Sequence, residues 1–201
     1  MQFYKRVLTG LIVVSLLTSC SEMSSGVTVG KKEITTSEIQ KSVDEVLVAR
    51  KNIDTSQMEL VEGPELLRNQ AQFVIISNVL DKIATDMKLS VTPADIAARR
   101  ANIITQIGGE GELPKALVGA SLAESNLNAY LRILIISERV TSEIIKSGTP
   151  ESESADAVTK IVTEAAAKLG VKVNAKYGKW NPKSATIDTA DVTDGAVTPL
   201  P

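Results

Sequence analysis

The sequence contains no histidine, and its only cysteine is Cys20. Without histidine, no side chain titrates near neutral pH unless its pKa is strongly shifted. A single cysteine excludes an intramolecular disulfide and, in a chain without histidine, a zinc site of the Cys/His type. Aromatic residues make up only 3% of the chain, which argues against a surface that stacks on bases or sugars. Carboxylates, lysine, tyrosine, serine and threonine remain as the side chains available for chemistry.

The charge balance gives little support to nucleic acid as a partner, because the pI is about 5.4 and no basic run is present. Carboxylate pairs occur at Asp44-Glu45 and at Glu110 and Glu112, but their polar surroundings predict solvated surface rather than acid–base catalysis. No metal site and no cofactor are expected. An apolar fraction of 43% over 201 residues predicts one globular domain, with or without tails.

The first nineteen residues are typical of a targeting segment. Lys5 and Arg6 give it a positive start, and the apolar stretch at 7–17 is too short to span a bilayer. At its end, Leu17 and two small residues precede Cys20. This pattern resembles the lipobox of bacterial lipoproteins, in which the cysteine thiol receives a diacylglycerol and the chain is cut just before it. An ordinary signal peptide followed by an unmodified cysteine is the alternative.

We therefore predict a lipoprotein signal peptide at 1–19 and a lipidated tether at 20–26. The protein would be held by Cys20 to the outer face of the cell membrane, or would face the periplasm in a two-membrane bacterium. Removal of residues 1–19 leaves 20 basic and 24 acidic residues, a net charge of −4. A chain with this net charge is not expected to be held to anionic lipid by charge, so the lipid anchor would have to hold it.

Apolar residues repeat at helical spacing over most of the remaining chain. The segment from Phe73 to Ile76 is apolar on all sides, so the second helix is expected to be central. Thr92 with Asp95, and Ser121 with Glu124, have the spacing of capping boxes. Helices are predicted at roughly 36–51, 64–89, 93–107, 121–146 and 155–169, with a short apolar piece within 110–120.

Two short strands flank these helices, at 27–29 and 171–177. Neither is long enough to be stable alone, so we predict that they pair and bring residues 29 and 173 close together. Residues 183–201 offer little to bury and are predicted to form a disordered tail. The predicted fold is mostly α: a compact domain over 27–182 with about five to six helices, and a small two-stranded β element that joins its N- and C-terminal ends.

Four segments carry a resemblance to a known family. They are Val27 to Thr35, Leu89 to Ile96, Leu117 to Arg132, and Leu169 to Pro182. In this order, they resemble the N-terminal chaperone domain of SurA-type and PrsA-type extracytoplasmic proteins, a helical domain also related to trigger factor. The resemblance covers about residues 27–182.

The chain departs from that family at one place. Many members carry a parvulin peptidyl-prolyl isomerase domain between the long helix and the last helix, but here Gly148 to Ser154 is too short to hold a domain. Parvulin sites are also built around histidine, which this chain lacks. The resemblance therefore implies a non-enzymatic protein. It would be an ATP-independent chaperone or holdase that binds unfolded or newly translocated protein segments. A dedicated interaction module for one envelope partner is the alternative.

Five apolar residues flank the loosest part of the chain, around Gly108, Gly109 and Gly111. If they form a mobile apolar lip, they could adapt to varied client sequences. They could equally seal the core of the domain. The candidate client-binding residues are Ile103, Ile107, Leu113, Leu117 and Val118.

Overall fold

The structure is a computed structural model, and it describes residues 24–189. The predicted signal peptide, Cys20 and residues 190–201 lie outside this part. The described chain has six α-helices, five short strands and four single 3₁₀ turns. They are β1 (Ser25–Val29), β2 (Lys32–Thr35), α1 (Thr36–Arg50), α2 (Gly63–Asp86), α3 (Pro93–Ile107), α4 (Leu113–Gly119), α5 (Leu127–Lys146), α6 (Ser154–Leu169), β3 (Val171–Val173), β4 (Lys179–Asn181) and β5 (Thr186–Asp188). The mostly α fold predicted from the sequence is confirmed.

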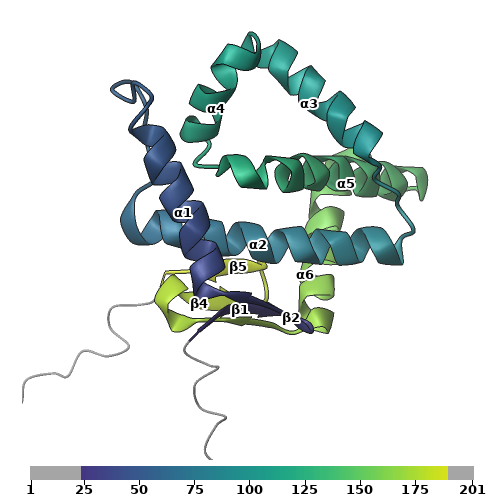
Figure 1. The fold of residues 1–201 in the computed structure, drawn as a ribbon. Helices are drawn as coiled ribbons and strands as arrows, with labels where there is room; N and C mark the ends of the chain where they lie inside the picture. Colours follow the sequence, from purple (N-terminus) through teal and green to yellow (C-terminus); the bar gives the residue numbers. More distant parts are fainter. Residues whose placement is uncertain (1–23, 190–201) are drawn as a thin grey trace, which may run out of the picture.

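Helix α2 lies at the centre of the domain, as its all-round apolar middle predicts. It contacts α1, α5 and α6 as well as β1 and β5. Figure 1 shows the strands on one side of α2, α5 on the other side, and an arch made of α3 and α4 beyond α5. The molecule therefore has two distinct ends, a sheet end and an arch end.

Two helices begin with the capping box that their sequences favour. Thr92 and Asp95 exchange hydrogen bonds at the start of α3: the Thr92 N–H donates to the Asp95 carboxylate over 2.8 Å, and the Asp95 N–H donates to the Thr92 hydroxyl over 3.2 Å. Thr35 and Glu38 do the same at α1. The box predicted at Ser121 is wrong. Ser121 has a left-handed backbone (φ 51°), and α5 begins only at Leu127.

The predicted pairing of the two chain ends is confirmed, although residue 173 lies opposite residue 27 rather than residue 29. β1 pairs antiparallel with β3, so that Val27 lies opposite Val173 and Val29 opposite Val171. The sheet has a third strand, because β2 folds back on the other edge of β1 to give the order β2-β1-β3. β1 begins at Ser25, so the last two residues of the predicted tether belong to the sheet instead. Val27, Val29 and Ile34 are buried on its inner face.

The C-terminal part is more ordered than predicted. β3 ends at Val173, and a 3₁₀ turn follows that buries Tyr177. The disordered tail predicted from residue 183 is wrong as far as 189, because β4 and β5 form an antiparallel hairpin. The hairpin is fixed to α2 by Gln72, whose side-chain amide donates to the Ala185 carbonyl (2.8 Å) and accepts from the Ile187 N–H (2.7 Å).

Candidate functional site

The arch end contains an apolar cluster that is separate from the main core. Helix α3, a 3₁₀ turn at Glu110–Glu112 and helix α4 arch over α5, and the cluster lies under them. Leucines from α4, α5 and the turn between them form its buried part, and Phe73 reaches it from α2. Its members are Leu113, Leu117, Leu122, Leu127 and Leu131, with Phe73, Ile96, Ile103, Ile104 and Ile107 packed against them.

The five candidate client-binding residues divide into two groups. Leu113, Leu117 and Val118 are buried, at 7%, 8% and 1% exposure, and they belong to a regular helix, α4. These three side chains therefore close the core of the domain, as the second interpretation of the sequence expects. The segment that could have formed a mobile lip is a packed helix instead. Ile103 and Ile107, on α3, are only partly buried.

Helix α3 is the least buried α-helix in the described part of the domain. It contains no fully buried residue, whereas each of the other α-helices within 24–189 buries at least two. Two ion pairs hold it to α5: Asp95 with Arg139 at 2.9 Å, and Arg99 with Glu138. Hydrogen bonds from Thr92, followed by the nearby Arg139, hold the pKa of Asp95 below its usual value. Asp95 is therefore ionised at neutral pH and serves both the cap and the ion pair.

A glycine pair forms the joint between α3 and α4. Gly108 and Gly109 have φ values of 96° and 116°, a region that side-chain-bearing residues rarely adopt. An ion pair bridges the joint, because both terminal guanidinium nitrogens of Arg100 donate to the Glu110 carboxylate, Nη2 at 2.9 Å. This bonding lowers the pKa of Glu110. The two glycines thus allow the backbone to bend at this joint, and an exposed ion pair holds the bent conformation.

A buried polar contact anchors the far end of α4. The Gln70 side-chain amide donates to the Ser121 carbonyl over 2.8 Å, and Gln70 is only 4% exposed. Arg50 donates to the Ser121 hydroxyl (3.0 Å) and to the Val61 carbonyl (2.8 Å). Ser121 therefore connects α1, α2 and α4, a role that its sequence neighbours do not indicate.

Each acidic pair noted in the sequence has one carboxylate that is held in a local contact. The Glu45 carboxylate accepts from the Ser125 hydroxyl (2.6 Å) and N–H (2.8 Å), and these bonds lower its pKa. A lowered pKa keeps the group ionised, the opposite of what a general acid requires. Glu110 is held by Arg100 in the same sense. Nowhere along residues 24–189 do three acidic side chains gather as metal ligands would.

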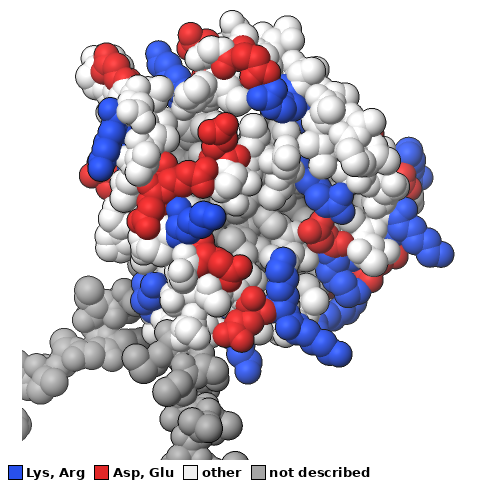
Figure 2. Space-filling view, in the orientation of Figure 1, with Lys and Arg blue, Asp and Glu red and all other residues white. Residues whose placement is uncertain are grey.

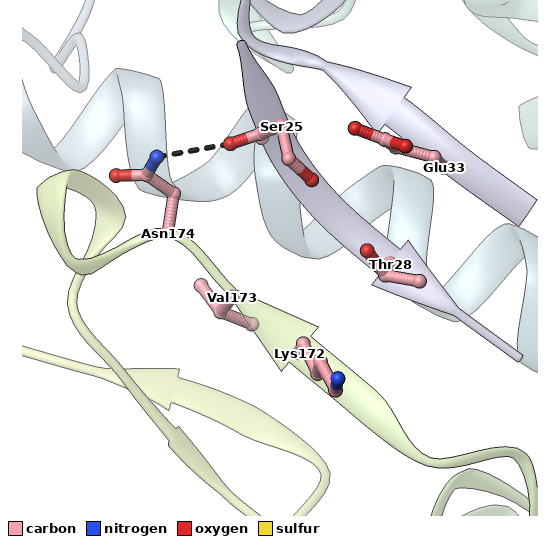
Figure 3. Close-up of a pocket in the computed structure, with 7 residues that line it drawn as sticks. Ser25, Thr28, Glu33, Lys172, Val173 and Asn174 are labelled. Carbon is pink, nitrogen blue, oxygen red and sulfur yellow. Dashed lines mark hydrogen bonds between the residues drawn. The ribbon is translucent and has the colours of Figure 1, made fainter. Parts of the chain in front are cut away.

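A hollow lies at the opposite end, on the outer face of the three-stranded sheet (Figure 3). It has a volume of about 350 Å³. Its walls are mainly polar, and the Asn174 side chain donates to the Ser25 carbonyl over 2.9 Å at its rim. The lining residues are Ser25, Gly26, Thr28, Glu33, Lys172, Val173 and Asn174.

No helix in the described part of the chain has the length and apolar character needed to cross a membrane. Comparison with known proteins gives one positive finding. The family model of the SurA-like N-terminal domain matches residues 2–127, which is more than half of the chain. Neither a curated protein nor a solved structure matches the chain significantly.

The family match fits the observed fold and the order of motifs in the sequence. It reaches from the N-terminal segment to the start of α5, and so includes β1, the central helix and the whole arch. Domains of this family are chaperone-type rather than catalytic, and they are generally extracytoplasmic. The chain belongs to the SurA-like N-terminal domain family.

Proposed function

We propose that this protein is a membrane-anchored, extracytoplasmic holdase that binds unfolded or newly translocated protein segments without ATP. The observation that carries this proposal is the incomplete burial of α3. Its isoleucines cover an apolar cluster without being fully buried themselves, so a modest displacement of one helix would expose a leucine-rich surface. Apolar surface of this kind binds exposed hydrophobic segments with little sequence preference.

Release without an energy source requires weak binding. We expect micromolar affinity at best, on the order of −8 kcal/mol. A lipid anchor compensates for weak affinity, because tethering raises the effective concentration of the holdase where chains emerge from the membrane. The holdase would be non-enzymatic, since the segment between α5 and α6 is too short for a parvulin domain and the chain has no histidine.

The first prediction concerns the anchor. Replacing Cys20 with Ala should abolish lipidation, leave the signal peptide uncleaved and change the membrane-bound fraction after cell fractionation. The reason is that the only thiol in the chain stands where the lipobox pattern requires it. Ser21→Ala, one position further on, is the matched control and should be processed and bound like the wild type. Unchanged processing and membrane association of Cys20→Ala would show that another feature anchors the protein.

The second prediction concerns clients. A photoreactive amino acid at Ile103, on the partly buried face of α3, should crosslink many different proteins in cells when the products are identified by mass spectrometry. The same group at Lys160, an exposed position on α6, is the control and should crosslink few. One stoichiometric partner at Ile103 would instead support the alternative function, an interaction module for a single envelope protein.

A further inference from the structure

The charges of this protein are separated between its two ends. We define the base as residues 24–35 and 168–189, which form the strands, their turns and the last turn of α6. The base has seven lysines and two carboxylates, a net charge of +5, whereas residues 36–167 have thirteen basic and nineteen acidic residues, a net charge of −6. The small net charge of the whole chain therefore hides a strongly basic end. The base lysines are Lys31, Lys32, Lys168, Lys172, Lys176, Lys179 and Lys183.

The base lysines are available to an external anion. All seven are exposed. Each ion pair found within residues 24–189 lies in the helical body, and none includes a base lysine. From Lys168 to Ile187 the chain has five lysines and no acidic residue. Figure 2 shows basic side chains gathered over the lower right of the molecule, where Figure 1 places the end of β2 and α6.

The sheet presents a polar outer face at this end. Its inner face packs on α2 through Val27, Val29 and Ile34. Since side chains alternate along a strand, Thr28 and its register partners Lys172 and Glu33 belong to the opposite face. There they line the hollow described above, with Lys172 beside hydroxyl and amide groups that can bond phosphate oxygens (Figure 3).

The proposed anchor site is close in sequence to this face. Ser25 starts β1, and Cys20 is only five residues earlier. Five residues span at most about 18 Å when fully extended. A lipid on Cys20 therefore keeps the base close to the bilayer surface. The reach of this short segment is comparable to the distance, about 8 Å at physiological salt, over which surface charges act.

We propose that the base is a docking surface for the anionic phospholipid headgroups of the membrane that carries the anchor. Lysine clusters next to a lipid anchor are attracted to such headgroups. Docking would turn the arch end, which lies beyond α2 and α5, away from the bilayer and toward emerging chains. This inference rests on the proposed anchoring at Cys20, and it adds an orientation that a flexible tether alone would not impose.

The test is lysine footprinting on the full processed protein. The lipidated chain is reconstituted on vesicles of phosphatidylcholine alone or mixed with phosphatidylglycerol, and lysine acetylation is read by mass spectrometry. Lys176, Lys179 and Lys183 should lose reactivity several-fold on the anionic vesicles only, and added salt should restore it. The exposed body lysines Lys41, Lys51 and Lys115 are internal controls and should react equally on both vesicles. Equal reactivity of the base lysines on both vesicles, or protection of the controls, overturns the proposal.

A pair of charge-matched variants separates this inference from the anchor. Changing Lys176, Lys179 and Lys183 to Glu should reduce flotation with anionic vesicles and leave flotation with neutral vesicles unchanged. Changing Lys41, Lys51 and Lys115 to Glu alters the net charge equally and should reduce neither.

Failure of the wild type to float with neutral vesicles refutes the anchor, while its binding to anionic vesicles still reports on the base. If both variants lose anionic binding equally, net charge governs it and the docking surface is refuted. Competition by polyglutamate that exceeds competition by anionic vesicles would identify an acidic polypeptide instead and also overturn the proposal.

Discussion

Deleting residues 171–201 should abolish cooperative unfolding of the whole domain, although the deletion removes no part of α1 to α6. The lost segment contains β3, the buried Tyr177 at 2% exposure and Ile187 at 6%. Its removal uncovers Val27 and Val29 and the face of α2 beneath the hairpin. Each large apolar side chain that becomes exposed costs about 1.5–3 kcal/mol, and a domain is stable by only about 5–15 kcal/mol in total. A thermal melt followed by circular dichroism measures the effect.

Two shorter truncations provide the controls. Ending the chain at 189 retains every described strand and should leave the melting temperature unchanged. Ending it at 182, the domain boundary predicted from the sequence, removes β5 together with both Gln72 hydrogen bonds, and should lower the melting temperature to an intermediate value. Equal melting temperatures for chains ending at 170 and at 189 would contradict the role assigned to this segment.

Adjacent residues of β5 provide a finer control. Ile187 points inward and is buried, while Thr186 points outward and is exposed. Ile187→Asn should therefore destabilise the domain by several kcal/mol, as buried polar substitutions do, and Thr186→Asn should change little. The hairpin has one further requirement: a Cβ atom at Gly178 would overlap the Asp188 backbone carbonyl, so this position must be glycine.

The sequence predicts the helices and the closing pair of strands because both depend on local patterns. Apolar spacing locates the helices to within a few residues at most ends, and the Thr92-Asp95 cap is satisfied entirely by neighbouring atoms. The pairing of β1 with β3 follows from a simple requirement. The short strands predicted at 27–29 and 171–177 need partners, and each lies at one end of the helical chain.

The errors occur where a distant residue decides the local structure. The hairpin at 179–188 depends on Gln72, more than one hundred positions earlier, and only Ile187 and Trp180 are large and apolar within it. Its composition is that of a loop, so local patterning cannot detect it. Ser121 fails as a cap because Arg50 and Gln70 reach it from α1 and α2, and its backbone adopts a left-handed turn instead.

The candidate site could be predicted only in part for a related reason. Spacing identifies Ile103, Ile107, Leu113 and Leu117 as apolar faces, but it does not tell which of them another element covers. In the structure α4 is a helix of only seven residues. Isolated helices of that length are unstable in water, so its leucines must be packed for it to exist. The glycines before it permit the bend, and burial rather than mobility is the outcome.

Changing both Leu113 and Leu117 to Ser should strongly destabilise the arch end. Both side chains are buried in the apolar cluster, and each truncation removes packing and leaves a hydroxyl without an assured partner. We expect a loss of about 3 kcal/mol for each substitution. A domain of this size loses roughly 2–4 °C of melting temperature per kcal/mol, so a melting curve detects the effect easily. An unchanged curve would show that α4 is not packed as described.

The matched variant carries Ser at Ile103 and Ile107, the partly buried positions of α3. Because α3 buries no residue fully, this pair should cost clearly less stability than the leucine pair. It should nevertheless lose the ability to suppress aggregation of an unfolded model protein, since these isoleucines face the surface that clients would enter. Lost suppression with a nearly unchanged melting curve separates binding from folding at this site. Full suppression by the isoleucine variant would show that clients do not bind at Ile103 and Ile107, although Ile96 and Ile104 on the same helix would be unchanged.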